Sequence, residues 1–428
     1  MLFIFLGVFV LFMLLGVPVA FAMGGTALVC SVVLWGVSGV PLPILTQQVV
    51  AGVNSFTTLA IPLFLFAGKL MNSGGITDRI FNFCQKLVGH LPGGLGHVNV
   101  LASVIFSGMS GTAAADAGGL GSMEIKAMED QGFDTGFSVA VTGASSLIGP
   151  IIPPSVPMVT YGVLSGTSVS ALFIGGILPG LLMAASMSAL VVFYSIRRNY
   201  PRCARATFQE LLHEFGRAFL PLLTPVIIIG GIWTGVFTPT EAAGVATTYA
   251  FFIIVFVYQE MRVKEVWFMA KETVVDCVAV LSIVAFVTVY GYVLTRTRIP
   301  QILAEAVFEF TSDPTLIVLL LVAFLLIVGC FMSTMESILL FTPIFYPLLN
   351  EAGVNLLVFG VIMCLVLMVG QLTPPFGIVL FVLTKISGME MMEVVKHSLP
   401  FTLPVLLVVA LIILFPGIVT FLPSLMIV

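Results

Sequence analysis

The chain repeats its own pattern of glycines and prolines at a fixed spacing, and this internal repeat limits its fold more than any other feature. Two similar proline-broken segments, GPIIPPS from Gly149 and GQLTPPF from Gly370, begin 221 positions apart. The same spacing pairs Pro18 with Pro239. A spacing that holds over so much of the chain predicts two copies of one structural unit.

Apolar residues make up 59% of the chain and charged residues 8%, and the mean hydropathy is +1.19. A water-soluble surface needs more charge than this, so the composition predicts a chain that crosses the lipid bilayer many times. The apolar runs have the length of membrane-spanning helices, and the short alternating segments of a β-barrel are absent. We therefore expect an all-α polytopic membrane protein. The net charge of -4 comes with no basic stripe, which excludes nucleic acid as a partner.

Each half is expected to contain a re-entrant helical hairpin followed by a broken membrane-spanning helix. The small-residue runs FSGMSGT (106–112) and FMSTMES (331–337) interrupt apolar stretches, which favours a hairpin tip at mid-membrane over a continuous span. The expected units are a first repeat at 1–196 with its hairpin near 98–125 and its broken helix near 135–168, a linker at 197–217, and a second repeat at 218–428 with its hairpin near 314–348 and its broken helix near 354–387.

The distribution of positive charge predicts how the chain is oriented. If the linker is cytoplasmic and each hairpin returns to its own side, all of the 16 lysines and arginines except Arg296 and Arg298 lie on the inside. This agrees with the positive-inside rule and would fail if either hairpin crossed the membrane. The two halves are then inverted relative to each other, and both termini lie outside.

Hydroxyl side chains gather where the hairpin tips and the helix breaks are expected to meet. Polar groups are costly in lipid and tend to mark ion or substrate paths. Proline leaves backbone carbonyls without a donor, and such carbonyls hold cations in broken transporter helices. The alternative is that the small residues only allow close helix packing. The hydroxyls are Ser107, Ser110 and Thr112 in the first tip, Ser145 before the first break, Ser333 and Ser337 in the second tip, and Thr373 in the second break.

Three carboxylates lie within or beside apolar runs, namely Asp116, Glu241 and Glu336. Any of them could neutralise a bound cation or relay protons. Asp116 follows the first tip by one helical turn and is the best candidate for orienting it. Glu241 follows a proline at a predicted helix start, where the helix dipole favours a carboxylate without any further role.

Arg296 and Arg298 are the two exceptions to the charge rule. Arg296 in particular could hold a substrate carboxylate, because a guanidinium group matches a carboxylate in a two-pronged arrangement. The alternatives are contact with lipid headgroups and docking of a partner protein.

The first tip also contains GMSG (108–111), which matches a short motif of intramembrane serine proteases. That chemistry needs a base, and the four histidines fall in predicted loops or at membrane edges. No GxxxxGK[ST], HExxH or GxSxG motif occurs, so ATP hydrolysis and zinc or serine hydrolysis have no support. We therefore expect a secondary transporter rather than an enzyme.

Four longer segments resemble the large membrane subunit of tripartite ATP-independent periplasmic (TRAP) transporters, with the sialic acid branch as the nearest group. They are LAIPLFLFAGKLMNSGGI (59–76), GGLGHVNVLASVIFSGMSGTAAADAGGLG (93–121), GVFTPTEAAGVA (235–246) and QLTPPFGIVLF (371–381). The resemblance implies a bacterial inner-membrane protein that imports carboxylates or sialic acid with sodium. It also implies an elevator mechanism, in which the hairpins and broken helices move against a scaffold formed by the other helices.

The resemblance further implies two partners, a small membrane subunit of four helices and a periplasmic substrate-binding protein, which we expect to be separate chains. A stand-alone sodium-coupled dicarboxylate carrier with a similar inverted repeat is the alternative.

The resemblance also assigns residues to Na⁺. The family's sodium sites correspond here to Ser110, Thr112, Gly149, Ile152 and Pro154 in the first half and to Met332, Ser333, Gly370 and Thr373 in the second. Backbone carbonyls are the expected ligands where the side chain offers no oxygen. Because Ile152 stands where the second half has Thr373, we expect the two sites to differ in affinity. The residues assigned to the organic anion are Arg296, Ser107, Ser145 and Ser337.

Overall fold

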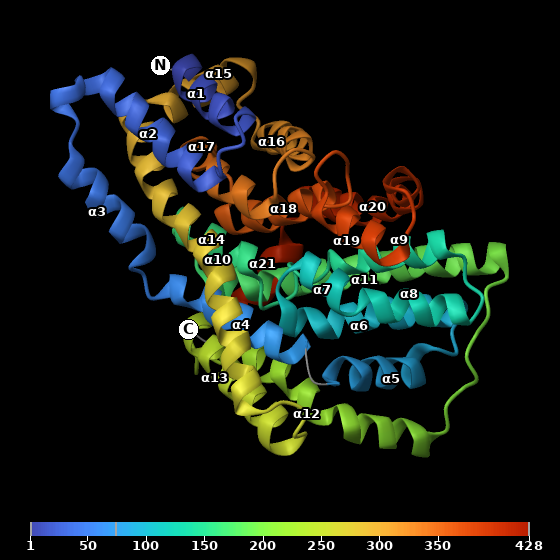
Figure 1. Cartoon of the computed structure of the whole chain (residues 1–428). Helices are drawn as coiled ribbons and strands as arrows, with labels where there is room; N and C mark the ends of the chain where they lie inside the picture. Colours follow the sequence, from blue (N-terminus) through green and yellow to red (C-terminus); the bar gives the residue numbers. More distant parts are fainter. Residues whose placement is uncertain (1, 73–74, 427–428) are drawn as a thin grey trace.

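The computed structural model describes residues 2–72 and 75–426, which form helices joined by short loops and contain no strand (Figure 1). The prediction of an all-α protein is confirmed. The helices of the first half are α1 (Leu2–Leu14), α2 (Val19–Trp35), α3 (Leu42–Val53), α4 (Ala60–Asn72), α5 (Ile76–Val88), α6 (Gly94–Ser110), α7 (Ala113–Gly119), α8 (Gly121–Asp130), α9 (Thr135–Ser146), α10 (Val156–Ser165) and α11 (Val169–Arg198), with the single turns η1 (Val37–Gly39) and η2 (Thr57–Leu59).

The second half follows the same order of elements. Its helices are α12 (Phe208–Trp233), α13 (Pro239–Phe252) with the π-helical turn η3 (Ile253–Val257), α14 (Val263–Arg296), α15 (Ile299–Phe310), α16 (Pro314–Gly329), α17 (Thr334–Glu351), α18 (Leu356–Gly370), α19 (Ile378–Ser387), α20 (Met391–Leu414) and α21 (Gly417–Ser424). The 221-residue spacing carries α7 and α8 onto α17, α9 onto α18 and α10 onto α19. Each half therefore contains a hairpin, a broken helix and a long closing helix.

The halves differ where one long helix replaces two. The residues of the second half that correspond to α3 and α4 at the 221-residue spacing form one helix, α14, which continues without a break for 34 residues. In the first half the chain bends by 52° between these two helices, at residues 54–56. Helix α3 is not expected from the sequence, because two prolines and two glutamines make the segment PLPILTQQ look unlike a membrane span.

Five of the described helices are long and apolar enough to cross a bilayer, and two bent pairs of helices raise that number to seven. The five are α11, α12, α13 with its π-helical turn, α14 and α20, and the bent pairs are α3 with α4 and α15 with α16. Among the shorter apolar helices, α6, α10, α18 and α19 belong to the hairpins and broken helices, which are expected to end inside the membrane, and α2 belongs to neither.

The helices pack into two groups. In the first group, α14 packs along α2, α3 and α4, and α13 packs on α4 and α12. In the second group, α16 packs on α18, α9 on α20, α10 on α17 and α11 on α21. Two amphipathic helices at corresponding positions join the groups: α5 contacts α12 and α6, and α15 contacts α14 and α17 (Figure 1).

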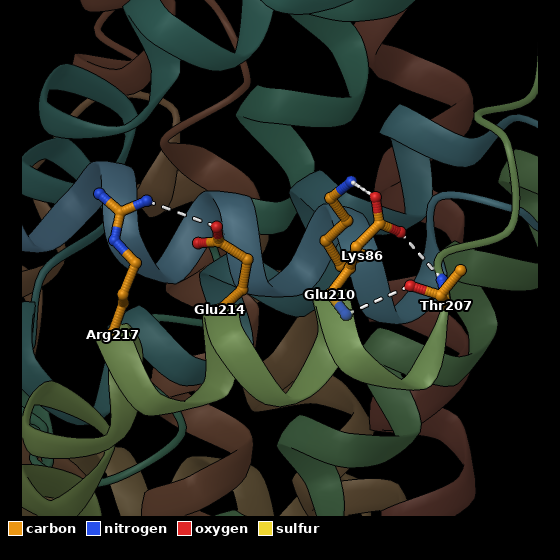
Figure 2. Close-up of polar contacts among 5 residues, drawn as sticks. All are labelled: Lys86, Thr207, Glu210, Glu214 and Arg217. Carbon is orange, nitrogen blue, oxygen red and sulfur yellow. Dashed lines mark hydrogen bonds and ion pairs between the residues drawn. The ribbon is translucent and has the colours of Figure 1, made fainter.

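The segment between the halves is shorter than the predicted linker, because α12 already begins at residue 208. Thr207 starts this helix with a capping box, in which its backbone N–H donates to Glu210 Oε2 at 2.9 Å and its Oγ1 accepts from the Glu210 N–H at 3.3 Å. Glu210 also pairs with Lys86 of α5 at 3.5 Å (Figure 2). The end of the predicted linker is therefore the first part of α12, and Glu210 ties it to α5.

A second polar contact holds the start of the broken helix α9. Asp134 Oδ2 accepts a hydrogen bond of 2.5 Å from the Tyr200 hydroxyl and pairs with Arg198 Nη1 at 2.9 Å. Both partners stabilise the ionised carboxylate, the Tyr200 hydrogen bond most, and they lower the pKa of Asp134. The pKa of Tyr200 is raised to about 12, mainly because the hydroxyl is partly buried and also because it donates to the Asp134 carboxylate.

We expect Asp134→Asn to lower the melting temperature of the purified protein by no more than a few degrees near neutral pH, because exposed ion pairs contribute little. A lowered carboxyl pKa means that this contribution is complete above the unfolded-state pKa of about 3.9 and is lost as the pH falls below it. The difference in melting temperature between wild type and variant should therefore shrink as the pH approaches 4. A difference that grows on acidification would contradict this assignment.

Candidate ion and substrate sites

The first hairpin tip meets the first helix break. Gly111 has a left-handed backbone (φ 65°) and reverses the chain between α6 and α7. A Cβ atom at Gly111 would lie 3.0 Å from the carbonyl oxygen of Pro154. Thr112 caps α7, and its Oγ1 accepts from the Ala115 N–H at 3.4 Å. The predicted ligands Thr112 and Pro154 are thus on the two sides of one close contact, while the side chain of Ser110 lies outside the described part of the structure.

The first break is buried along its whole length, from residue 149 to residue 155. Pro153 and Pro154 are joined by a cis peptide bond. Neither proline can donate to a carbonyl one turn earlier, and Ser155 Oγ donates to only one of those carbonyls, that of Pro150. Among the described residues, no backbone or side-chain donor reaches the carbonyl oxygens of Gly149, Ile152 or Pro154. These three predicted ligands therefore have acceptor oxygens to offer.

The second tip meets the second break in the same way. The Phe376 N–H donates to the Cys330 carbonyl at 3.2 Å, which joins the chain just after the break to the tip. Ser333 caps α17 in a capping box with Glu336, whose Oε2 accepts from the Ser333 N–H at 3.1 Å. Glu336, predicted as a supporting carboxylate, thus holds the backbone of the tip. Met332 precedes Ser333 in the tip, and no donor among the described residues reaches the Met332 carbonyl.

The second break is bordered by one of the closest backbone contacts among the described residues. A Cβ atom at Gly370 would lie 2.2 Å from the carbonyl oxygen of Gly329, where α18 ends beside the end of α16. The Thr373 hydroxyl donates to the Val369 carbonyl at 2.8 Å, which leaves the oxygen lone pairs of Thr373 for another partner. Pro374 and Pro375 repeat the cis peptide bond of the first half.

The two junctions share one electrostatic arrangement. At the first, α6 and α9 end while α7 and α10 begin, and at the second, α16 and α18 end while α17 and α19 begin. Helix ends of opposite polarity place both carbonyl groups and N–H groups at each junction, which suits a cation beside an anion. The junctions differ in exposure, because Pro375 and Phe376 are exposed whereas the first break is buried.

The predicted substrate hydroxyls do not form one cluster. The Ser107 hydroxyl donates to the Val104 carbonyl of its own helix at 2.6 Å. The Ser145 hydroxyl donates to Asn99 Oδ1 at 2.6 Å, below the tip in the packing of α6 against α9. The Ser337 hydroxyl is buried near the second tip without a hydrogen-bond partner. Of these three hydroxyls, that of Ser337 is the one that makes no hydrogen bond to a described residue.

The other two predicted carboxylates have different surroundings. Asp116 is buried in α7, and neither of its oxygens has a hydrogen-bond partner, although Ser103 of α6 lies beside it. Glu241 is at the start of α13, where it accepts from the Thr238 N–H and hydroxyl at 2.8 Å each. The contacts of Glu241 are those of a helix cap, in the group of helices that contains no hairpin.

Arg296 is at the end of α14, and its guanidinium carbon lies 5.4 Å from the centre of the Tyr292 ring. It lines an open cavity of about 660 Å³ together with Arg298, Tyr292 and Gln48 of α3. Both arginines are exposed, and neither forms an ion pair within the described part of the chain. No residue of the hairpin tips lines this cavity, so the structure keeps Arg296 apart from the predicted hydroxyls.

Three polar residues of the hairpin group were not predicted. Asn99 is fully buried and donates to Thr142 Oγ1 at 2.6 Å. Gln371 donates to Thr334 Oγ1 at 2.9 Å and so links the second break to the second tip. Glu124 is buried in α8. Gln371 could have been found from the sequence, because it directly follows Gly370 at the second break. Asn99 and Glu124 could not, because their burial depends on packing between helices that are distant in the chain.

The protease alternative lacks its base. His97, the histidine nearest to GMSG in the sequence, is 11 positions before Gly108 on the same helix, which is about 16 Å along its axis. Its Nε2 is instead within 3.1 Å of the Pro92 carbonyl.

Comparison with known proteins identifies the family. Residues 6–418 match the family described as the tripartite ATP-independent periplasmic transporter, DctM component. The chain is 42% identical to the sialic acid TRAP transporter large permease protein SiaM of Vibrio cholerae, over 96% of this chain and 95% of that one. It is 40% identical to the sialic acid TRAP transporter permease protein SiaT of Haemophilus influenzae, over 98% of this chain and 68% of that one.

The fold has a counterpart among solved structures. The crystal structure of the Alcanivorax borkumensis YdaH transporter aligns with a TM-score of 0.67 at 14% identity, over 87% of this chain and 88% of that one. The relatives are named as permeases and not as enzymes. The chain therefore belongs to the DctM component family of tripartite ATP-independent periplasmic transporters and is a multi-pass inner-membrane permease subunit.

Proposed function

We propose that this subunit imports an organic anion together with Na⁺, that a periplasmic binding protein delivers the anion, and that a small four-helix membrane subunit completes the complex. Sialic acid is the first candidate substrate, because two relatives that match most of the chain are named for it. Dicarboxylates are the second. In the membrane, both termini face the periplasm, as the placement of the lysines and arginines favours.

One observation carries the sodium proposal. At both junctions a hairpin tip touches a proline-broken segment, and some carbonyl oxygens there accept no hydrogen bond from a described residue. These carbonyls are those of Gly149, Ile152 and Pro154 at the first junction and of Met332 and Thr373 at the second, where the Gly370 carbonyl accepts one bond, from the Thr373 N–H at 3.1 Å. Carbonyls of unwound segments and of helix C-terminal ends are the groups that hold Na⁺ in transporters with inverted repeats. Gly149, Ile152 and Pro154 would hold one ion, and Met332, Gly370 and Thr373 a second, with Thr112 and Ser333 adding hydroxyls.

The grouping of helices supports an elevator mechanism. The hairpins and broken helices all belong to the group of α6–α11 and α16–α21, and the bent pair α3–α4 packs with α14 in the other group. The hairpin group would move as one body against the scaffold group, with α5 and α15 as the connections. The substrate carboxylate would lie between the two tips, where N-terminal helix ends are available. Arg296 would meet an acidic group on the outer face.

The test is uptake of labelled sialic acid into proteoliposomes that hold this chain and the small subunit, with the binding protein outside. An inward Na⁺ gradient should drive accumulation, and replacing Na⁺ with K⁺ should abolish it. An excess of unlabelled succinate, added as a competitor of labelled sialic acid, tests the dicarboxylate alternative. Accumulation by this chain alone, without the binding protein and small subunit, would refute the tripartite proposal in favour of a stand-alone carrier. Uptake that ignores Na⁺ would refute sodium coupling.

A further inference from the structure

A chain of side-chain hydrogen bonds joins the two backbone segments that border the second proposed ion site. The side-chain amide of Gln371, in the break, donates to Thr334 Oγ1, in the first turn of α17, at 2.9 Å. The Thr334 hydroxyl donates in turn to the carbonyl of Leu367, in the last turn of α18, at 3.3 Å. These two bonds, which we call the Gln371 bridge, therefore connect the break, the tip and the end of α18.

The direction of both bonds in the Gln371 bridge is fixed. In a continuing helix the backbone N–H of Gln371 would donate to the Leu367 carbonyl, but here it donates to the Met368 carbonyl at 3.0 Å. The Leu367 carbonyl is thus open to the buried Thr334 hydroxyl, which gives its proton to it. A hydroxyl whose proton is already used can only accept from a further partner, so position 371 has to supply a donor. The glutamine amide does so.

The Gln371 bridge joins the direct neighbours of two proposed sodium ligands. Thr334 follows Ser333 in the tip, and Gln371 follows Gly370 in the break. In the proposed function, Ser333 and Gly370 contribute oxygens to the second ion from opposite sides of the junction. An ion site whose ligands are already held in place by other bonds loses less free energy when it orders around the ion. The bridge holds the two sides of this site together before Na⁺ arrives.

The residues of the first junction cannot form the same bridge. At the 221-residue spacing, Gln371 corresponds to Pro150 and Thr334 to Ala113, and neither of these side chains has a hydrogen-bonding group. In the first half the tip meets the break through the close approach of Gly111 to the Pro154 carbonyl. The bridge is therefore an asymmetry between two otherwise similar sites.

We propose that Gln371 is a positioning residue for the second sodium site. Through Thr334 it holds the tip on the break, and it thereby raises the affinity of this site for Na⁺. The inference rests on the proposed sodium coupling. Because the first junction lacks the bridge, the second site is the tighter of the two.

The test is the sodium-dependent melting of the purified complex, which does not require transport. An ion that binds only the folded protein raises the melting temperature, and a weaker site needs more of the ion for the same rise. We would add Na⁺ at constant ionic strength, with K⁺ as the replacement ion, and record the Na⁺ concentration that gives a fixed small rise. Gln371→Met keeps the length of the side chain but removes the donor. It should increase this concentration about threefold, as expected for one lost hydrogen bond.

Two substitutions of Thr334 test the middle of the bridge. Thr334→Val removes the hydroxyl and should increase the required Na⁺ concentration as Gln371→Met does, whereas Thr334→Ser keeps the hydroxyl and should restore the wild-type value. The variant with both Gln371→Met and Thr334→Val should be no weaker than either single variant, because the two residues act as one unit. Gln209→Met, at an exposed position of α12, is the matched control and should respond as the wild type does.

A variant that is only less stable melts at a lower temperature in both K⁺ and Na⁺, but it needs the wild-type Na⁺ concentration for the fixed rise. That outcome for Gln371→Met would overturn the inference. Equal responses of Thr334→Val and Thr334→Ser would also overturn it, even if Gln371→Met failed to fold. If the wild type responds to Na⁺ and the bridge variants respond identically, the role of Gln371 is wrong while sodium coupling stands. If the wild type shows no response to Na⁺, both proposals are wrong.

Discussion

Replacing Gly370 with alanine should abolish sodium-driven uptake, because the added methyl group has no room. Its Cβ would lie 2.2 Å from the Gly329 carbonyl oxygen and 2.6 Å from the Gly329 Cα, and both atoms belong to the backbone. The ends of α16 and α18 would have to separate, at the position where the second ion site is proposed. Overpacking of this kind typically costs 1–3 kcal/mol, so we expect roughly that loss of stability.

The matched control is Gly244→Ala in α13, where an added Cβ would have no other atom within 4 Å. Alanine in an open helical position is neutral or slightly stabilising, so this variant should keep the wild-type melting temperature and uptake. Melting of the purified complex and uptake into proteoliposomes are the two measurements. Wild-type uptake by Gly370→Ala would show that the contact between the two helix ends is dispensable.

Thr373→Val should weaken the response to sodium without weakening assembly. Valine keeps the size of threonine, but it removes the hydroxyl oxygen that remains available after the bond of 2.8 Å to Val369. We expect the Na⁺ concentration for half-maximal uptake to rise about tenfold, which corresponds to about 1.4 kcal/mol. Co-purification with the small subunit should be unchanged. Ser333 is a poorer probe, because its hydroxyl also caps α17.

Ile152→Val is the control, since Ile152 occupies the corresponding position of the first half and offers no side-chain oxygen in either form. This variant should respond to Na⁺ as the wild type does. An unchanged sodium response of Thr373→Val would remove this hydroxyl from the second site. A response altered equally in both variants would instead point to a packing effect common to the two breaks.

Much of the fold was predictable because it follows from local properties of the chain. Paired prolines end helices wherever they occur, and a glycine such as Gly111 reverses the chain with little strain. The sequence therefore indicates a helix end at each tip and at each break, and the structure ends helices at residues 110, 146, 329 and 370. Helix α3 was not expected, since its composition resembles a loop and its partner is the distant α14. Likewise, the hydroxyls of Ser107 and Ser145 looked equally available in the sequence, but the Ser107 hydroxyl donates within its own helix. The packing of α6 against α9 directs the Ser145 hydroxyl to Asn99.

The sequence by itself determined the repeat, the all-helical membrane fold and the two proline-broken segments. These depend on proline spacing and on the length of apolar runs, both of which can be read without knowing any contact. The tertiary structure decided which helices pack together, that the first break is buried while the second is partly exposed, and that Glu124 of α8 is buried. Burial depends on residues far away in the chain, and a carboxylate in a short polar segment looks the same whether packing exposes it or encloses it.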